Sequence, residues 1–429
     1  MKTIGLITEY NPFHNGHLYH LHESKNISEN DLVIAVMNGQ FTQRGSPACL
    51  DKWQRAKMAV KSGVDLVLEL PLVAGIRSAH YFAQGSVRTL AATNIVDEIV
   101  FGSETGNIKP LKQIASLLAK EPREFREIFH DELQKGKSYP RAKSKAINKY
   151  FASKQINFSH SFKSNDLQTP GDIISSPNNI LGIEYIKNIY RDNFNITPKT
   201  IGRKKANYHD KYIKENNITS ATSIRNLVQK DKFTKAKQYM PKNCFNIMLK
   251  AKNQGKMPID RNMFKKIVVS TLRRSSRHEI INCPAFTSDI VNTIMHRQKH
   301  ADNFDELVNN VTSKTYTRTR IKRGLLQLVC RLYHLSSKNE EIIPEYIRVL
   351  ALGSKGEKIL SKLAKKADLP VITNPSDIIN EPCFDSKNQA ELHISLDVLA
   401  SNIYSLFYPK QKNRKTNLDF YTPLIKTGD

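Results

Sequence analysis

The chain has 429 residues, a length at which two or three domains are expected. Of these residues 39% are hydrophobic, which is enough for a sizeable core. Its 66 Lys and Arg residues against 40 Asp and Glu residues give a net charge of +26. Such an excess points to a polyanionic partner, most often nucleic acid. A membrane surface, for which no strongly amphipathic basic helix stands out, and a simply lysine-rich composition are the alternatives. The five scattered cysteines include no Cys-x-x-Cys pair, which argues against a disulfide framework and against a structural zinc site.

The N-terminus is not typical of a secretion signal. Its apolar run at residues 4–7 is short and is followed by Glu9, and no later stretch reaches the length of a membrane span. We therefore expect a cytoplasmic protein without membrane contact. Nothing in the sequence indicates a protein partner.

Apolar and helical segments alternate over the first hundred residues. We expect strands at 2–7, 31–37, 64–70 and 98–101, and helices at 51–61 and 78–91. Nearly continuous apolar strands joined by short connections predict an α/β fold with a Rossmann-like parallel sheet. Ligands of such sheets bind beyond the carboxyl ends of the strands, so the segments that follow the strand ends should gather at one edge.

The pattern changes in the middle of the chain. From about 109 to 176 it becomes helical and basic, which predicts a helical insertion. A loop at Ser176-Pro177-Asn178-Asn179 then leads into a helix at 180–190, and a short strand is expected at 199–201. Beyond about residue 230 the strand signal fades and basic helices predominate.

We therefore predict an α/β domain over residues 1–230, which would hold the ligand site, and a mainly α-helical, basic domain over residues 231–429. The strongly basic segment 313–323, SKTYTRTRIKR, belongs to the second domain. It suits contacts with an RNA backbone, and Tyr316 suits stacking on an unpaired base. An exposed amphipathic helix is the alternative.

The most informative motif is the turn His14-Asn15-Gly16-His17 between the first expected strand and helix. Backbone N–H groups and the helix dipole make such a junction an anion site. Gly16 allows close approach of the backbone, and the two imidazoles supply donors for phosphate oxygens. Nucleotidyl transfer requires mainly this positioning and charge stabilisation, so we expect His14 and His17 to be catalytic. A surface turn with two incidental histidines is the alternative.

A second motif is Ser220-Ala221-Thr222-Ser223-Ile224-Arg225. A Ser/Thr cluster at a helix start is most often only an N-cap, but Arg225 one turn later suits contact with a phosphate. Glu104 suits either the ribose or a Mg²⁺-bound water, or caps a helix. The charged residues of the 51–61 helix, namely Asp51, Lys52 and Arg55, are expected on a solvated face.

Together these motifs resemble the signatures of the HxGH nucleotidyltransferase superfamily. The closer resemblance is to the bacterial tRNA(Met) cytidine acetate ligase family. The run GLITEYNPFHNGHLYH at residues 5–20 is similar to the opening of that family. Further similar blocks are MNGQFTQRG at 37–45, FGSE at 101–104, PNNILG at 177–182 and Tyr208-His209-Asp210.

The resemblance implies an ATP-dependent ligase that activates acetate as acetyl-adenylate. The acetyl group would then pass to the wobble cytidine of elongator tRNA(Met), giving N4-acetylcytidine. Mg²⁺ would accompany ATP, with no metal site on the protein itself. Alternatives are a small-molecule adenylyltransferase of cofactor synthesis and a non-catalytic, nucleotide-sensing RNA-binding protein.

The resemblance and the two motifs together select the ATP-binding residues. Of the two neighbouring asparagines, Asn178 is favoured over Asn179. The set is Ile7, Thr8, Glu9, Tyr10, Asn11, Pro12, Phe13, His14, Asn15, Gly16, His17, Leu18, Tyr19, His20, Gly102, Asn178, Arg203, Ser220 and Arg225.

Overall fold

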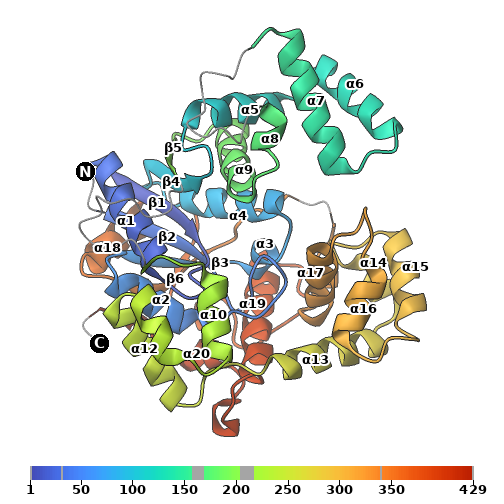
Figure 1. The fold of residues 1–429 in the computed structure, drawn as a ribbon. Coiled ribbons are helices and arrows are strands. Elements are labelled where there is room, and N and C mark those ends of the chain that lie inside the picture. Colours follow the sequence, from blue (N-terminus) through green and yellow to red (C-terminus); the bar gives the residue numbers. More distant parts are fainter. Residues whose placement is uncertain (1, 30–31, 157–168, 203–216, 339–340, 428–429) are drawn as a thin grey trace.

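A computed structural model describes residues 2–29, 32–156, 169–202, 217–338 and 341–427. Within them the chain forms an eight-stranded sheet of order β5-β4-β1-β2-β3-β6-β7, with β8 beside β6 (Figure 1). The strands from β5 to β3 in this order are parallel to one another. They are β1 (Thr3–Thr8), β2 (Leu32–Asn38), β3 (Leu66–Leu70), β4 (Glu98–Ser103) and β5 (Thr197–Gly202).

The sequence-predicted strands and helices of the first hundred residues are present, with ends shifted by one or two residues. Helix α2 (Lys52–Lys61) begins after Asp51, whose carboxylate accepts a 2.8 Å hydrogen bond from the Gln54 amide. Helix α4 (Ala79–Ala91) fills the second expected interval. Helix α1 (Asn15–Ser28) is the next element after β1. The α/β fold with a mainly parallel sheet is thereby confirmed.

The C-terminal part of the chain completes the sheet. Strand β6 (Ile347–Leu352) pairs antiparallel with β3 and is buried along its whole length. The short strands β7 (Val371–Ile372) and β8 (Ile425–Lys426) pair with β6. The sequence pattern does not predict them, because a six-residue apolar run fits a buried helix as well as a strand. The sheet thus contains strands from both sides of residue 230, and a domain boundary at that residue stays a prediction.

Helices fill the segment between β4 and β5. They are α5 (Ile108–Lys120), α6 (Arg123–Gln134), α7 (Tyr139–Ser153), α8 (Pro170–Ile173) and α9 (Pro177–Arg191). Helix α9 packs against α4 and α5, while α6 and α7 project away from the sheet at the top of Figure 1. The predicted loop at 176–179 is wrong in one respect. Pro177 to Asn179 form the first turn of α9, a position that tolerates proline because its N–H would have no helical partner.

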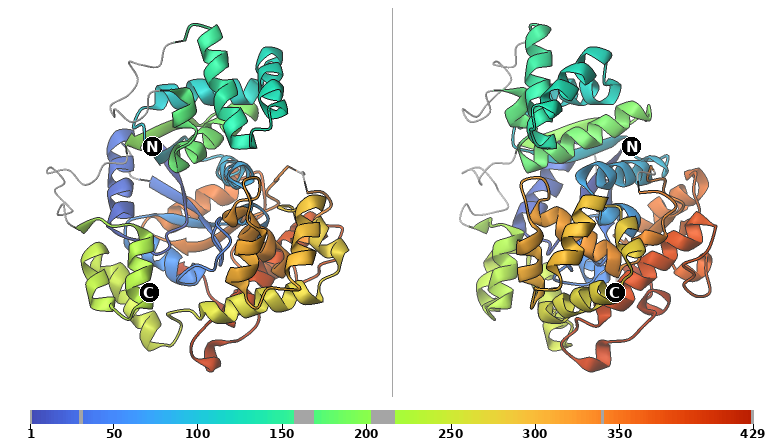
Figure 2. Two further views of the ribbon diagram at one scale, coloured as in Figure 1. Left: turned by 45° about the vertical axis from the view of Figure 1, so that its right-hand side comes forward. Right: turned by 90° about the vertical axis from the view of Figure 1, so that its right-hand side faces the viewer.

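The remaining helices lie around the part of the sheet that is away from α6 and α7 (Figure 2). Helix α10 (Ala221–Gln229) leads through α11 (Phe233–Ala236) to α12 (Lys242–Asn253), which packs on α2. A second group lies to the right of Figure 1: α13 (Arg261–Arg274), α14 (Arg277–Asn282), α15 (Ser288–Arg297), α16 (Phe304–Val311) and α17 (Arg318–Val329). The last helices are α18 (Gly356–Lys366), α19 (Gln389–Ser405) and α20 (Leu418–Tyr421).

The core has two main parts, one on each face of the sheet. Ile34 and Val36 of β2 belong to one hydrophobic cluster, whereas the alternate residues Val33 and Ala35 belong to the other. This alternation is expected because successive side chains of a strand point to opposite faces. No helix of the described residues is both long and apolar enough to cross a membrane.

A buried ionic network joins the C-terminal segment to the α/β core. The ammonium of Lys52 lies 2.7 Å from Glu69 on β3 and 2.5 Å from Asp419 on α20. Arg348 on β6 contacts the same two carboxylates. The predicted solvated face of α2 is therefore wrong. Lys52 and Arg55 are at most 1% exposed, because carboxylates and carbonyls inside the protein replace their hydration.

Candidate active site

The His14-Asn15-Gly16-His17 turn forms a reciprocal cap at the start of α1. The Gly16 amide donates a 3.0 Å hydrogen bond to Nδ1 of His14, and the His14 amide donates a 3.2 Å hydrogen bond to Nδ1 of His17. The two rings stack with centroids 3.8 Å apart. Since Nδ1 accepts in both neutral rings, the ring proton lies on Nε2. Each imidazole is thus held as an Nε2–H donor at a positive helix end.

Gly16 is required by the packing of this cap. A Cβ atom at position 16 would lie 2.9 Å from Cε1 and 3.1 Å from Nδ1 of His14. Both contacts are shorter than ordinary van der Waals separations, so any larger residue displaces the His14 ring. The glycine therefore sets the position of the imidazole as well as admitting a ligand close to the backbone.

Arg225 from α10 reaches the same turn. Its Nη1 donates a 2.7 Å hydrogen bond to the carbonyl oxygen of Asn11, and Nη2 donates to Thr222 at 2.8 Å. Burial lowers the pKa of Arg225, although the group stays a cation at neutral pH. The second sequence motif therefore lies beside the first.

The Asn15 side chain fixes the approach of the second motif. Its Nδ2 donates to the carbonyl oxygens of Asn217 at 2.9 Å and Gln238 at 3.0 Å. The segments before and after α10 are thus held against the first turn of α1. Ser220 caps α10 through its hydroxyl, which accepts from the Ser223 amide at 3.1 Å, so the N-cap interpretation of Ser220 is confirmed.

Arg55 is a structural residue of the site that the sequence pattern does not reveal. Its guanidinium donates to the carbonyl oxygens of Leu50, Glu9 and Gly39, with 3.1 Å to Leu50 and 2.7 Å to Glu9. The loops after β1 and β2 are thereby joined through one cation. The sequence gives little signal of this role, because a basic residue in an amphipathic helix such as KWQRAKMAVK is also typical of a solvated surface helix.

Glu9 makes the second connection between these loops. Its Oε1 accepts from Nδ2 of Asn38 at 3.0 Å and from the Gln43 amide at 2.7 Å. Asn11 accepts a 2.8 Å hydrogen bond from the Cys49 amide. Burial raises the pKa of Cys49 to about 11, so this residue is a neutral thiol at pH 7 and is unsuited to act as a nucleophile.

Several residues of the predicted ATP-binding run face the core. Tyr10 and Phe13 are almost completely buried in the hydrophobic cluster below the turn, and Leu18 and Tyr19 pack against it. Their side chains therefore support the turn, and any contact of Tyr10 or Phe13 with a nucleotide passes through the backbone.

The remaining predicted residues lie on neighbouring elements. Gly102 lies on β4, the strand beside β1. Asn178 donates to Glu104, whose carboxylate also accepts from the amides of Asn178 at 3.2 Å and Asn179 at 2.9 Å. Of the two roles expected for Glu104, helix capping is the one formed here. Arg203 and the block at 208–210 lie outside the described residues.

Metal-binding side chains do not converge anywhere in the described part of the chain. Groups of three or more His, Cys, Asp or Glu residues with suitable geometry are absent from it. Two histidines weighed as possible ligands have other partners: His80 lies 3.1 Å from the Glu184 carboxylate, and Nε2 of His278 lies 3.2 Å from the side-chain Nδ2 of Asn282.

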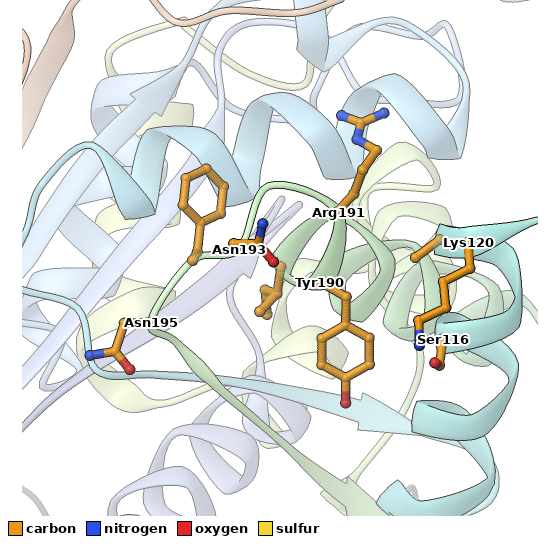
Figure 3. Close-up of a pocket in the computed structure, with 9 residues that line it drawn as sticks. Ser116, Lys120, Tyr190, Arg191, Asn193 and Asn195 are labelled. Atoms are coloured by element: carbon orange, nitrogen blue, oxygen red, sulfur yellow. The ribbon is translucent and has the colours of Figure 1, made fainter.

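A cavity of about 670 Å³ opens at another part of the molecule (Figure 3). Ser116, Lys120, Tyr190 and Asn193 are among the residues that line it. It lies just before the start of β5, at the amino ends of the parallel strands. The His14–His17 turn follows the carboxyl end of β1, so the cavity and the turn lie at opposite ends of the parallel strands.

Comparison with known proteins agrees with this geometry. The family model described as HIGH Nucleotidyl Transferase matches residues 1–419. The tRNA(Met) cytidine acetate ligase of Halothermothrix orenii is 40% identical over 430 residues, covering 99% of this chain and 100% of the relative. The enzyme of the same name from Acetivibrio thermocellus is 38% identical with the same coverage. The chain belongs to the tRNA(Met) cytidine acetate ligase family.

Solved structures of this ligase family share the whole fold. The crystal structure of Thermotoga maritima TmcAL bound with alpha-thio ATP superposes with a TM-score of 0.88 at 34% identity, over 99% of each chain. The apo form of the same protein gives a TM-score of 0.87. The family resemblance of the His-x-Gly-His and Ser220–Arg225 motifs therefore extends over the full length of the chain.

Proposed function

We propose that this chain activates acetate with ATP and transfers the acetyl group to the wobble cytidine of elongator tRNA(Met). The product is N4-acetylcytidine, with pyrophosphate and AMP released. The names of the full-length relatives support the substrate assignment. The observation that carries the chemistry is the reciprocal cap, which holds His14 and His17 as paired Nε2–H donors at the start of α1.

The first step forms a mixed anhydride. A carboxylate oxygen of acetate attacks the α-phosphorus of ATP, and the bond to the pyrophosphate oxygen breaks. Acetate is already ionised at neutral pH, so its attack needs no general base. The Nε2–H groups of His14 and His17 stabilise the developing negative charge on the phosphate oxygens, and Arg225 adds positive charge beside the turn.

The second step transfers the acetyl group to RNA. The exocyclic amine of cytidine attacks the carbonyl carbon of acetyl-adenylate, the bond to the AMP phosphate oxygen breaks, and the amine loses one proton. AMP leaves as a stabilised phosphate anion. ATP, acetate and tRNA are present together in the cytoplasm, and we place the reaction there.

We assign the predicted set, from Ile7 to His20 with Gly102, Asn178, Arg203, Ser220 and Arg225, to ATP binding. Mg²⁺ enters as part of the ATP complex, because phosphate oxygens are the ligands it prefers. The basic helices beyond residue 230 are assigned to tRNA, and residues 1–230 to catalysis.

Two assays test the proposal. Acetate-dependent exchange of labelled pyrophosphate into ATP measures the first step, and transfer of labelled acetate to tRNA measures the second. We expect both, with transfer restricted to elongator tRNA(Met). Exchange without transfer would indicate a small-molecule adenylyltransferase, and ATP binding without exchange would indicate a nucleotide sensor. Either result contradicts the proposal.

A further inference from the structure

Positive charges extend from the catalytic turn toward the C-terminal helices. Arg225, hydrogen-bonded to Asn11 just before the turn, has its pKa lowered by burial and further by the charges of Arg261 and Arg44. Arg261 is the first residue of α13, and Arg44 is exposed on the loop after β2. Three cations from separate segments therefore lie close together at this edge of the sheet.

The loop that carries Arg44 touches α17. Its tip is closed by a hydrogen bond of 3.0 Å from the Gly45 amide to Thr42, and Gly45 has a φ of +75°. A Cβ atom on Gly45 would lie 2.6 Å from the Arg323 nitrogen and 2.7 Å from the Lys322 carbonyl carbon. This contact brings the first turns of α17, the helical part of the basic segment 313–323, beside the catalytic edge.

Helices α13 and α17 extend the same positive region. Burial lowers the pKa of Lys322, and the charges of Arg318, Lys265 and Arg261 lower it further. Asp305 is shared between Lys265 at 2.5 Å and Arg318 at 3.4 Å. We define the cationic strip as Arg44, Arg261, Lys265, Arg318 and Lys322.

The charges of the strip are poorly compensated. Considering the carboxylates of the described residues only, Arg44, Arg261 and Lys322 form no ion pair within 4.0 Å, and Asp305 alone pairs with the other two cations. Clustered like charges destabilise a folded chain unless an anion neutralises them. A strip that spans a loop and two helices matches a series of phosphates better than one small anion.

We propose that the cationic strip binds the sugar–phosphate backbone of the RNA acceptor and guides it to the His14–His17 turn. The inference rests on the proposed function, because it assumes an RNA acceptor. The residues at the two ends of the strip fit this role. Arg44 and Arg261 are the strip residues whose charges act on Arg225 beside the turn, whereas Arg318 and Lys265 are 44% and 37% exposed.

The test replaces the three unpaired cations together, in the triple variant Arg44→Gln, Arg261→Gln and Lys322→Gln. The matched control neutralises Lys358, Lys362 and Lys365 of α18, which lies on the opposite side of the molecule (Figure 1). Each protein is assayed for tRNA binding over a range of salt concentrations, for acetate-dependent pyrophosphate exchange and for acetyl transfer to tRNA. Circular dichroism and thermal melting check that both variants fold.

We expect the strip variant to bind tRNA about tenfold more weakly or worse at low salt. Its slope of log affinity against log salt should fall by about 2, since each lost phosphate contact removes about 0.7 to 0.9. Pyrophosphate exchange should stay within about twofold of wild type, and the α18 control should match wild type throughout.

Three outcomes would overturn the inference while leaving the proposed function intact, provided that the wild type acetylates tRNA. They are unchanged tRNA affinity and salt slope, an equal loss in the α18 control, and a loss of pyrophosphate exchange equal to the loss of tRNA binding. The last would assign the strip to the phosphates of ATP. Failure of the wild type to transfer acetate would instead contradict the proposed function.

Discussion

The guanidinium of Arg225 donates a 2.7 Å hydrogen bond to the carbonyl oxygen of Asn11, joining residues 214 positions apart in the chain. One partner precedes the His-x-Gly-His turn and the other lies in the helix of the second motif. This bond places a cation beside the paired imidazoles. It also makes the geometry of the turn depend on packing against a segment that is distant in sequence.

Replacement of Arg225 should therefore impair the first chemical step. Arg225→Gln removes the charge and the strong hydrogen bond to Asn11, and we expect acetate-dependent pyrophosphate exchange to fall by about tenfold or more. Arg225→Lys keeps the charge but lacks the planar fork that bonds Asn11 and Thr222 together, so it should recover only part of the activity. Lys230→Gln, at the exposed end of α10, is the control. Exchange at the wild-type rate in Arg225→Gln would refute the role.

Substitution at His14 separates its capping role from its proposed catalytic role. Asparagine is a good N-cap residue, so His14→Asn should keep the acceptor for the Gly16 amide. Its free energy of unfolding should therefore stay within about 0.5 kcal/mol of the wild-type value. It lacks the Nε2–H donor, and pyrophosphate exchange should fall by about 10²-fold or more. His14→Ala should lose the same activity and a further ~1 kcal/mol of stability. Activity in His14→Asn close to wild type would show that the imidazole only caps the helix.

Protonation of Glu184 should destabilise the folded protein at low pH. Burial raises the pKa of this carboxyl, but the hydrogen bond from His80 and the charges of Lys187 and Lys143 outweigh burial and bring it down to about 2. A folded-state pKa below the unfolded value of 4.5 contributes stability above pH 4.5 that is lost as the pH falls toward 2. The contribution at pH 7 is about 3 kcal/mol.

Glu184→Gln should therefore unfold more easily at pH 7 and lose less stability than wild type between pH 4.5 and 2, as measured by urea denaturation. The control is Glu127→Gln on α6. Glu127 is 62% exposed and, among the described residues, pairs with Arg123 alone, so its replacement should cost at most about 1 kcal/mol. Parallel pH profiles for wild type and Glu184→Gln would contradict this account.

The buried Lys52 should be essential for the C-terminal segment to dock. Lys52→Met leaves Glu69 and Asp419 with Arg348 as their remaining cation, and breaking a buried ion pair costs about 3–5 kcal/mol. Hydrogen exchange of residues 418–421 should accelerate in this variant. Combining it with Asp419→Asn should restore part of the stability, because one uncompensated carboxylate is removed. A cost below 1 kcal/mol for Lys52→Met alone would argue against the network.

The amino-acid sequence by itself determined the local features of this protein. The alternation of apolar segments predicts β1 to β4 and their helices, because strand and helix periodicity is a property of neighbouring residues. The same holds for the His14–His17 turn, whose cap bonds join residues two or three positions apart. These short-range patterns, and the resemblance of the motifs to those of the ligase family, were enough to predict the fold class and the family.

Only the tertiary structure decided how the distant segments meet. Burial of Lys52 and Arg55, capping of α9 by Glu104 and the pairing of β6 with β3 each depend on partners remote in sequence. A charged side chain has the same local pattern whether water or a buried carboxylate surrounds it. The hydrogen bond from Arg225 to Asn11 is of the same kind, because its two ends meet only when the chain packs.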